Sequence, residues 1–269
     1  MKLKLWQVDA FATKALEGNP AAIVPLDSWL DDGLMQRIAA ENNLSETAFF
    51  VRTGAGAYDL RWFTPAAEID LCGHATLASA WVVLNALAPE LDRVAFQTRS
   101  GELVVKRGQS DHNIMSLPAD PVMPYAADGA AEILGKALGC PPPRALFKGI
   151  KFMAVWDDPA IIRNLAGPGD IEAALQSLGL WSVIVTAPGD AGYDFVSRFF
   201  STGFGIPEDP VTGSAHATLT PYWAKRLGNP QLKARQVSPR GGDLLCTDDG
   251  ARTILQGPCA LYLTGEIEI

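Results

Sequence analysis

The sequence has no cysteine pair at metal-binding or redox spacing. Its four cysteines are scattered along 269 residues, and no CxxC motif occurs. A chain of this length can bury a large core without a disulfide framework, and scattered cysteines are typical of a reducing compartment. The sequence therefore predicts a cytoplasmic protein with reduced thiols at Cys72, Cys140, Cys246 and Cys259.

Positive charge and long apolar runs are also scarce. The chain has 22 Lys and Arg against 30 Asp and Glu, a net charge of −8, and no basic cluster. Such a surface repels nucleic acid and anionic lipid. The longest strongly apolar stretch, residues 75–88, is too short to span a bilayer, and the N-terminal MKLKLWQVDAFA is typical of a strand rather than a signal peptide. We therefore expect neither nucleic acid nor a membrane as a partner.

Common cofactor motifs are missing as well. There is no GxGxxG after a predicted strand, no P-loop, no GxSxG and no HExxH. We therefore expect no cofactor and no metal site, so that any chemistry has to come from side chains and backbone groups.

What the sequence does contain is a stretch with the length and composition of a helix, CGHATLASAWVVLNALA at 72–88. From residue 75 onward only three of its positions are polar, so the helix is apolar on every side and should be buried. Its start, however, is small and polar. Unpaired N–H groups at a helix start carry partial positive charge, which predicts a site for a carboxylate or a developing anion.

The same stretch returns in the second half of the chain. HATLASAW at 74–81 is matched by HATLTPYW at 216–223, and RSGEL at 99–103 is matched by RGGDL at 240–244. Matches in one order, about half a chain apart, indicate a duplicated unit. We predict an α+β fold of two pseudo-equivalent lobes, each with one long helix (about 74–87 and 214–227) ringed by strands. The N-terminal lobe spans 1–118 with a C-terminal strand at about 258–269, and the C-terminal lobe spans 119–257.

Polar residues near the two helix starts form the candidate site. They are Glu46, His74, Asp209 and Ser214, with the backbone N–H groups of Gly73 and Gly213. If both helices start at one cleft, their positive ends would hold an anionic substrate, with Glu46 and Asp209 as the acid and base groups. Two alternatives stay open: His74 only caps its helix, and Asp209, which precedes a proline, only shapes a turn.

Glu46 is the most informative candidate because the repeat does not reproduce it. It lies in the strand LSETAFFV among apolar neighbours, and the repeat places Trp181 opposite it. A charge inside an apolar strand is costly unless it is used, which favours a functional role over an edge carboxylate that faces water. Cys72, at the predicted helix start, is expected to have its thiolate favoured, but its counterpart is Thr212, so a matched pair of thiols is absent. His216 is expected to be a satisfied core histidine.

Several of these segments carry a family resemblance. NLSETAFF (43–50), DLCGHATLASA (70–80), EDPVTGSAHATL (208–219) and VDAFATKALEGNPAAIVPL (8–26) resemble the phenazine-biosynthesis isomerase family, the PhzF-like proteins. The resemblance implies a diaminopimelate epimerase-like fold, in which each lobe is a β-barrel around a central helix and the active site lies in the cleft between the lobes. It also implies a cofactor-independent isomerase, usually a homodimer.

The resemblance also implies roles for single residues. By motif, the family's catalytic glutamate falls on Glu46, and its substrate-contacting histidine, aspartate and serine fall on His74, Asp209 and Ser214, with the glycines at Gly73 and Gly213. The epimerase relatives use one cysteine from each lobe as acid and base. Cys72 keeps one of these positions and Thr212 occupies the other, which argues against racemisation by two thiols.

We therefore predict an isomerase that shifts a proton within a small carboxylate-bearing substrate, with Glu46 as the shuttle. An amino-acid racemase or epimerase, with Asp209 as its second acid–base group, is one alternative. A non-catalytic protein that binds small carboxylates is the other.

Overall fold

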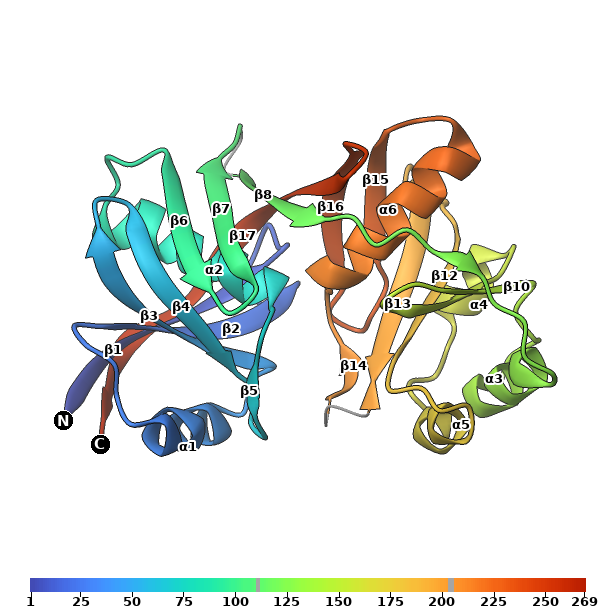
Figure 1. Ribbon diagram of the computed structural model, residues 1–269, viewed down its shortest axis with the longest axis horizontal. Helices are drawn as coiled ribbons and strands as arrows, with labels where there is room; N and C mark the ends of the chain where they lie inside the picture. Colours follow the sequence, from blue (N-terminus) through green and yellow to red (C-terminus); the bar gives the residue numbers. More distant parts are fainter. Residues whose placement is uncertain (110–111, 203–205) are drawn as a thin grey trace. The chain divides into compact units, whose positions relative to one another are not determined.

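The computed structural model describes residues 1–109, 112–202 and 206–269. These residues divide into two compact units (Figure 1): unit 1 comprises Met1–Leu117 and Ile254–Ile269, and unit 2 comprises Pro118–Thr253. Within these ranges, no helix is long and apolar enough to cross a membrane.

Unit 1 is a closed barrel of eight strands. They are β1 (Lys2–Ala10), β2 (Asn19–Leu26), β3 (Glu46–Gly54), β4 (Ala57–Phe63), β6 (Arg93–Thr98), β7 (Gly101–Arg107), β8 (His112–Pro118) and β17 (Arg252–Glu268). Each strand pairs with the next in that order, and β17 pairs back with β1. The β2–β3 and β4–β6 pairs are parallel. A parallel pair needs a crossover connection, which is supplied by α1 (Asp32–Asn42) and by α2 (Gly73–Val82).

Helix α2 lies inside this barrel, as its apolar composition predicts. Every residue of α2 except Trp81 is buried. The predicted helix ends differently, because its last turn, Val83–Leu87, is a π-helix (η1) in which the Ala88 N–H donates to the Val83 carbonyl. In the same turn the Asn85 side chain donates to the Trp81 carbonyl and so competes with the backbone for that acceptor.

Unit 2 repeats this arrangement. Its strands are β9 (Met123–Pro124), β10 (Ala145–Lys148), β11 (Phe152–Val155), β12 (Val183–Pro188), β13 (Phe195–Ser201), β14 (Ile206–Asp209), β15 (Gln231–Gln236) and β16 (Gly242–Asp248). Its helices are α3 (Ala130–Leu138), α4 (Pro159–Arg163), α5 (Ile171–Ser177) and α6 (Gly213–Leu227). The pairs β11–β12 and β13–β15 are parallel, as β2–β3 and β4–β6 are, and α6 connects β13 to β15 as α2 connects β4 to β6. The predicted duplication is confirmed.

Pro221 lies inside α6 without ending it. A proline has no N–H for the carbonyl four residues earlier, here that of Ala217. That carbonyl accepts the N–H of Asp120 at 3.0 Å and the hydroxyl of Thr253 at 3.5 Å instead. The helix therefore stays continuous because its freed acceptor is satisfied from outside.

Other differences from the predicted elements are local. The C-terminal strand predicted at about 258–269 begins earlier, since β17 runs from Arg252 to Glu268, and the short elements β5 (Glu68–Ile69), β9, β14 and α4 were not predicted. Segments of two to five residues are too short to show a hydrophobic period.

Candidate functional site

Glu46 is buried at the start of β3. Only 6% of the residue is exposed, and the parallel strand β2 lies beside it with Ala21 opposite. Its Oε2 lies 3.0 Å from Nε2 of His74, the second residue of α2. The alternative of an edge carboxylate that faces water is therefore wrong.

The other imidazole nitrogen of His74 is held as well. Its Nδ1 lies 3.0 Å from the side-chain nitrogen of Asn19 and 3.4 Å from Sγ of Cys72. Asn19 is the first residue of β2 and is completely buried. Sequence reasoning missed Asn19, and its only signal is that an asparagine in the strand-leading stretch EGNPAA needs a partner once it is buried.

The electrostatics of this group favour a paired carboxylate and imidazole. Burial alone would lower the pKa of His74, but Cys72 and the Glu46 carboxylate outweigh it and hold that pKa well above its ordinary value. Burial, aided by Glu46, raises the pKa of Cys72 to about 11. The expectation that the Cys72 thiolate is favoured is therefore wrong, because loss of solvent outweighs the positive end of the helix.

The two helix starts share one geometry. The N-cap residues Cys72 and Thr212 have extended backbones, and neither uses its side chain to cap its helix. The carbonyls of both accept the N–H four residues ahead, that of Thr76 at 3.3 Å and that of His216 at 3.2 Å. Gly73 and Gly213 are the buried first residues of the helices. Uncapped helix starts of this kind suit an anion.

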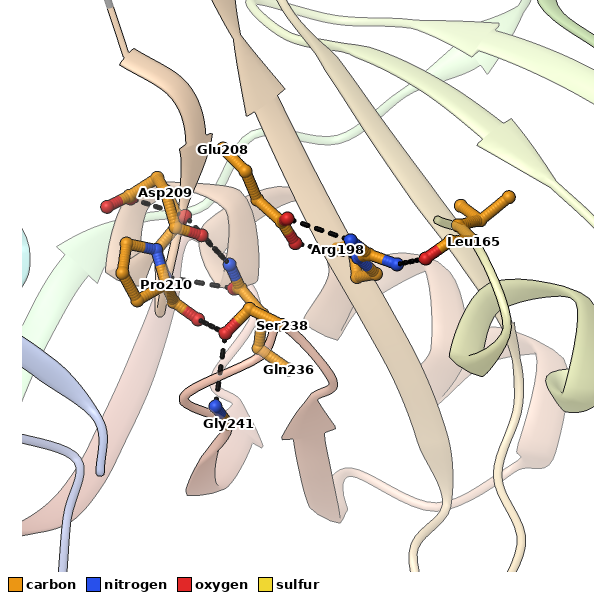
Figure 2. Close-up of polar contacts among 9 residues, drawn as sticks. Leu165, Arg198, Glu208, Asp209, Pro210, Gln236, Ser238 and Gly241 are labelled. Carbon is orange, nitrogen blue, oxygen red and sulfur yellow. Dashed lines mark hydrogen bonds and ion pairs between the residues drawn. The ribbon is translucent and has the colours of Figure 1, made fainter. Parts of the chain in front are cut away.

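In unit 2 a network of polar contacts fixes Asp209 (Figure 2). Asp209 ends β14 and is 8% exposed, and its Oδ2 accepts the hydroxyl of Thr212 at 2.5 Å. The carbonyl of Asp209 and the N–H of Thr212 both bond the side chain of Gln236. Ser214, in the first turn of α6, is partly exposed.

An Arg–Glu pair precedes each helix start. In unit 1, Arg61 of β4 binds both oxygens of Glu68 in β5 at 2.7 and 2.8 Å. In unit 2, Arg198 of β13 binds both oxygens of Glu208 in β14 at 2.6 and 2.8 Å (Figure 2). The duplication thus extends to the bonds that hold the short strand in front of each helix.

The carboxylates of the candidate site do not follow the repeat. When the two repeats are aligned by their strand registers, Ala48 of unit 1 corresponds to Ile184 of unit 2. The counterpart of Glu46 is therefore Ser182, one residue beyond the predicted Trp181. In the same alignment of the two repeats, the counterpart of Asp209 is Ile69. Each unit therefore has one carboxylate without a counterpart, at a different place in each.

The structure brings some predicted site residues together within a unit. Glu46, Cys72 and His74 form one buried group in unit 1, and Asp209 and Ser214 flank the start of α6 in unit 2. The predicted convergence of both groups in one cleft stays a prediction.

The group in unit 1 also has the donor atoms of a metal site. One oxygen of Glu46, one nitrogen of His74 and Sγ of Cys72 lie within 4.8 Å of one another. However, Nε2 of His74 faces Glu46 whereas Nδ1 faces Cys72, so one nitrogen would not reach an ion shared with both. The geometry is that of an ion pair between Nε2 and Glu46 and a hydrogen bond between Nδ1 and Cys72.

His216 is a core residue of α6. It is fully buried, and its Nδ1 lies 2.8 Å from the Thr212 carbonyl. Burial lowers its pKa to about 4. The expectation of a satisfied histidine holds for Nδ1 only, since Nε2 has no hydrogen-bond partner in the described part of the chain.

A β-barrel around a buried helix, repeated in a second unit, defines a class of fold that solved epimerases share. A hydroxyproline epimerase from Agrobacterium vitis, crystallised with bound trans-4-hydroxy-L-proline, matches with a TM-score of 0.61 and 12% identity over 99% of this chain and 92% of that one, a likeness of fold.

The family to which the chain belongs is narrower than this class of fold. The model of the phenazine biosynthesis-like protein family matches residues 8–265. A protein of Pseudomonas aeruginosa named as an uncharacterized isomerase is 47% identical over 100% of both chains. The crystal structure of a phenazine biosynthesis protein of the PhzF family from Enterococcus faecalis has a TM-score of 0.90 and 42% identity, with 100% of both chains covered. The chain belongs to the phenazine biosynthesis-like, or PhzF, family, and by class it is an isomerase. The cytoplasmic location and the homodimer stay predictions.

Proposed function

We propose that this isomerase shifts a proton within a small carboxylate-bearing substrate and that Glu46 carries the proton. The observation that carries the proposal is the burial of the Glu46 carboxylate, 3.0 Å from an imidazole whose pKa is raised. A buried carboxylate is costly unless it is paired or used, and Glu46 has no counterpart in the repeat.

The proposed mechanism begins with Glu46 as an anion. Nε2 of His74 faces this carboxylate at 3.0 Å and the pKa of the imidazole is raised, so a proton lies between the two groups. Glu46 then takes a proton from a carbon of the substrate that a neighbouring carboxylate or carbonyl acidifies. Negative charge develops on that neighbouring group, and Glu46 returns the proton at another carbon.

The developing charge requires hydrogen-bond donors. The uncapped starts of α2 and α6, at Gly73 and Gly213, and the side chains of His74 and Ser214 are the proposed donors. Asp209 is the proposed second acid–base group, held in place by Thr212. Cys72 takes no part as a base, because its thiol is protonated at neutral pH.

A racemase or epimerase that uses two thiols is disfavoured by the same residues. Cys72, the one cysteine at the start of a described helix, has a pKa of about 11, and Thr212 stands at the corresponding position of α6. An epimerase that uses Glu46 and Asp209 would work on a substrate with a single acidic C–H.

The test is a screen in D₂O. The protein is incubated with a panel of unsaturated cyclic carboxylates and of amino acids, and isomerised or deuterated products are followed by NMR. We expect product with wild type and with the control Glu41→Gln, an exposed residue of α1, and none with Glu46→Gln. Equal product from both variants would contradict the role of Glu46.

A further inference from the structure

A buried glutamine in unit 2 holds the loop that carries Asp209. Gln236 is the last residue of β15 and is completely buried. Its Nε2 donates to the carbonyl of Asp209 at 2.6 Å (Figure 2), and its Oε1 accepts the N–H of Thr212 at 2.9 Å. A backbone carbonyl only accepts and a backbone N–H only donates, so these two partners fix which way the amide points.

The second proton of this amide sets the direction of the next bond. Nε2 of Gln236 also donates to Oγ1 of Thr212, at 3.2 Å. The Thr212 hydroxyl thus accepts from Gln236 and uses its one proton toward Oδ2 of Asp209, at 2.5 Å. The three side chains form a one-way chain of donors that ends on a carboxylate.

The described residues of unit 1 form no such chain at the corresponding place. Thr98, the last residue of β6, corresponds to Gln236, the last residue of β15. The strand registers show this, because Phe96 pairs with Tyr58 in unit 1 as Ala234 pairs with Phe195 in unit 2. The Thr98 hydroxyl donates to Gly101 within its own hairpin. The donor chain therefore belongs to the unit whose unmatched carboxylate is Asp209.

We propose that Gln236 is a positioning residue that orients the Asp209 carboxylate through the Thr212 hydroxyl. The proposal rests on the proposed function, in which Asp209 is the second acid–base group. Thr212 precedes α6 as Cys72 precedes α2, and the proposal gives this threonine a role. Its hydroxyl does not exchange protons with substrate but holds the Asp209 carboxylate in one orientation.

The substitution Gln236→Glu tests this chain because it keeps the shape and the acceptor for Thr212 but removes the donor. An ionised glutamate donates to neither the Asp209 carbonyl nor the Thr212 hydroxyl and competes with Asp209 for the hydroxyl proton, whereas a protonated one restores one of the two lost donors. The variant should therefore be destabilised at high pH and recover on acidification. Gln231→Glu, at the exposed start of the same strand, is the matched control.

The readout is the thermal unfolding midpoint of the full chain relative to wild type at the same pH. For Gln236→Glu we expect a loss of at least about 5 °C near pH 8, and recovery of at least about half of it near pH 5. Gln231→Glu should stay within about 1 °C of wild type at both pH values. If Gln236→Glu folds only at acidic pH, the protein purified there should unfold as the pH is raised.

The coupling to Asp209 separates positioning from packing. In the Asp209→Asn background the side chain at 209 is neutral and does not depend on the Thr212 hydroxyl proton. The recovery of the Gln236→Glu unfolding midpoint at acidic pH should therefore fall below half its size in that background. A Thr212→Val background should reduce the recovery in the same way. In a Thr212→Ser background, which keeps the hydroxyl, the recovery at acidic pH should be as large as in the wild-type background.

Acid recovery of equal size in all of these backgrounds, or a Gln236→Glu variant as stable as Gln231→Glu near pH 8, would overturn the proposal. The experiment contains no substrate, so its failure is distinct from failure of the proposed isomerisation.

Discussion

The buried ion pair in front of α6 should be far more important to stability than its repeat in front of α2. The side chain of Arg198 is 3% exposed and that of Glu208 11%, and Arg198 also donates to the carbonyl of Leu165 (Figure 2). Among the described residues, no other cation pairs with Glu208. Arg198→Met should therefore strand a buried carboxylate, which typically costs about 3–5 kcal/mol.

Arg61→Met is the matched control, because it removes the same bidentate pair in unit 1. Glu68 keeps a second cation there, since Arg99 lies 2.7 Å from its Oε2 and is 54% exposed. Arg61 itself is 18% exposed, so its removal should cost only about 1–2 kcal/mol. The assay is urea denaturation, with free energies taken from midpoints after the slopes are checked for equality.

The double variant Arg198→Met/Glu208→Gln supplies the second comparison. It removes the stranded charge, so it should recover about half or more of the loss in Arg198→Met. An Arg198→Met variant that loses no more stability than Arg61→Met, or a double variant no more stable than Arg198→Met, would contradict the expected weight of the buried pair.

Three further predictions follow from the site. Because burial lowers the pKa of His216 to about 4, the stability contributed by its neutral form is complete above about pH 6.5 and is lost as the pH falls toward 4. His216→Gln should therefore lose less stability than wild type between pH 7 and pH 5 in urea denaturation, and an unchanged loss would contradict this. Iodoacetamide at neutral pH should modify the partly exposed Cys140 before Cys72, whose pKa is about 11; mass spectrometry that finds Cys72 labelled first would show an accessible thiolate. His74→Ala removes the imidazole that supports Glu46, so calorimetry should find weaker binding of small carboxylates, and unchanged affinity would assign His74 a structural role only.

Some of this structure could be predicted from the sequence because the signal is local. The apolar composition of 75–88 predicts burial of α2 wherever it packs, and the ordered matches to 213–227 predict a second unit. Glu46 could be singled out for the same reason, since its apolar neighbours and its lack of a repeated counterpart are both visible in the sequence.

The partners of the site residues could not be predicted, because the fold brings them from distant strands. Asn19 is 55 residues from His74, and Gln236 is 24 residues from Thr212. The prediction for the charge state of Cys72 was wrong for a related reason. Its place at a helix start favours the thiolate, but the barrel around it removes the solvent that a thiolate needs.

The role of Glu46 is best tested by the turnover of Glu46→Gln on a substrate that wild type isomerises, with affinity measured in parallel. Glutamine keeps the size and hydrogen-bonding reach of the side chain but accepts no proton. We expect a rate lower by about 10²–10⁴-fold, with affinity for the substrate little changed. A folded Glu46→Gln protein that binds the substrate and turns it over within about threefold of the wild-type rate would show that Glu46 does not carry the proton, since that difference is far below the usual contribution of a positioned acid–base group.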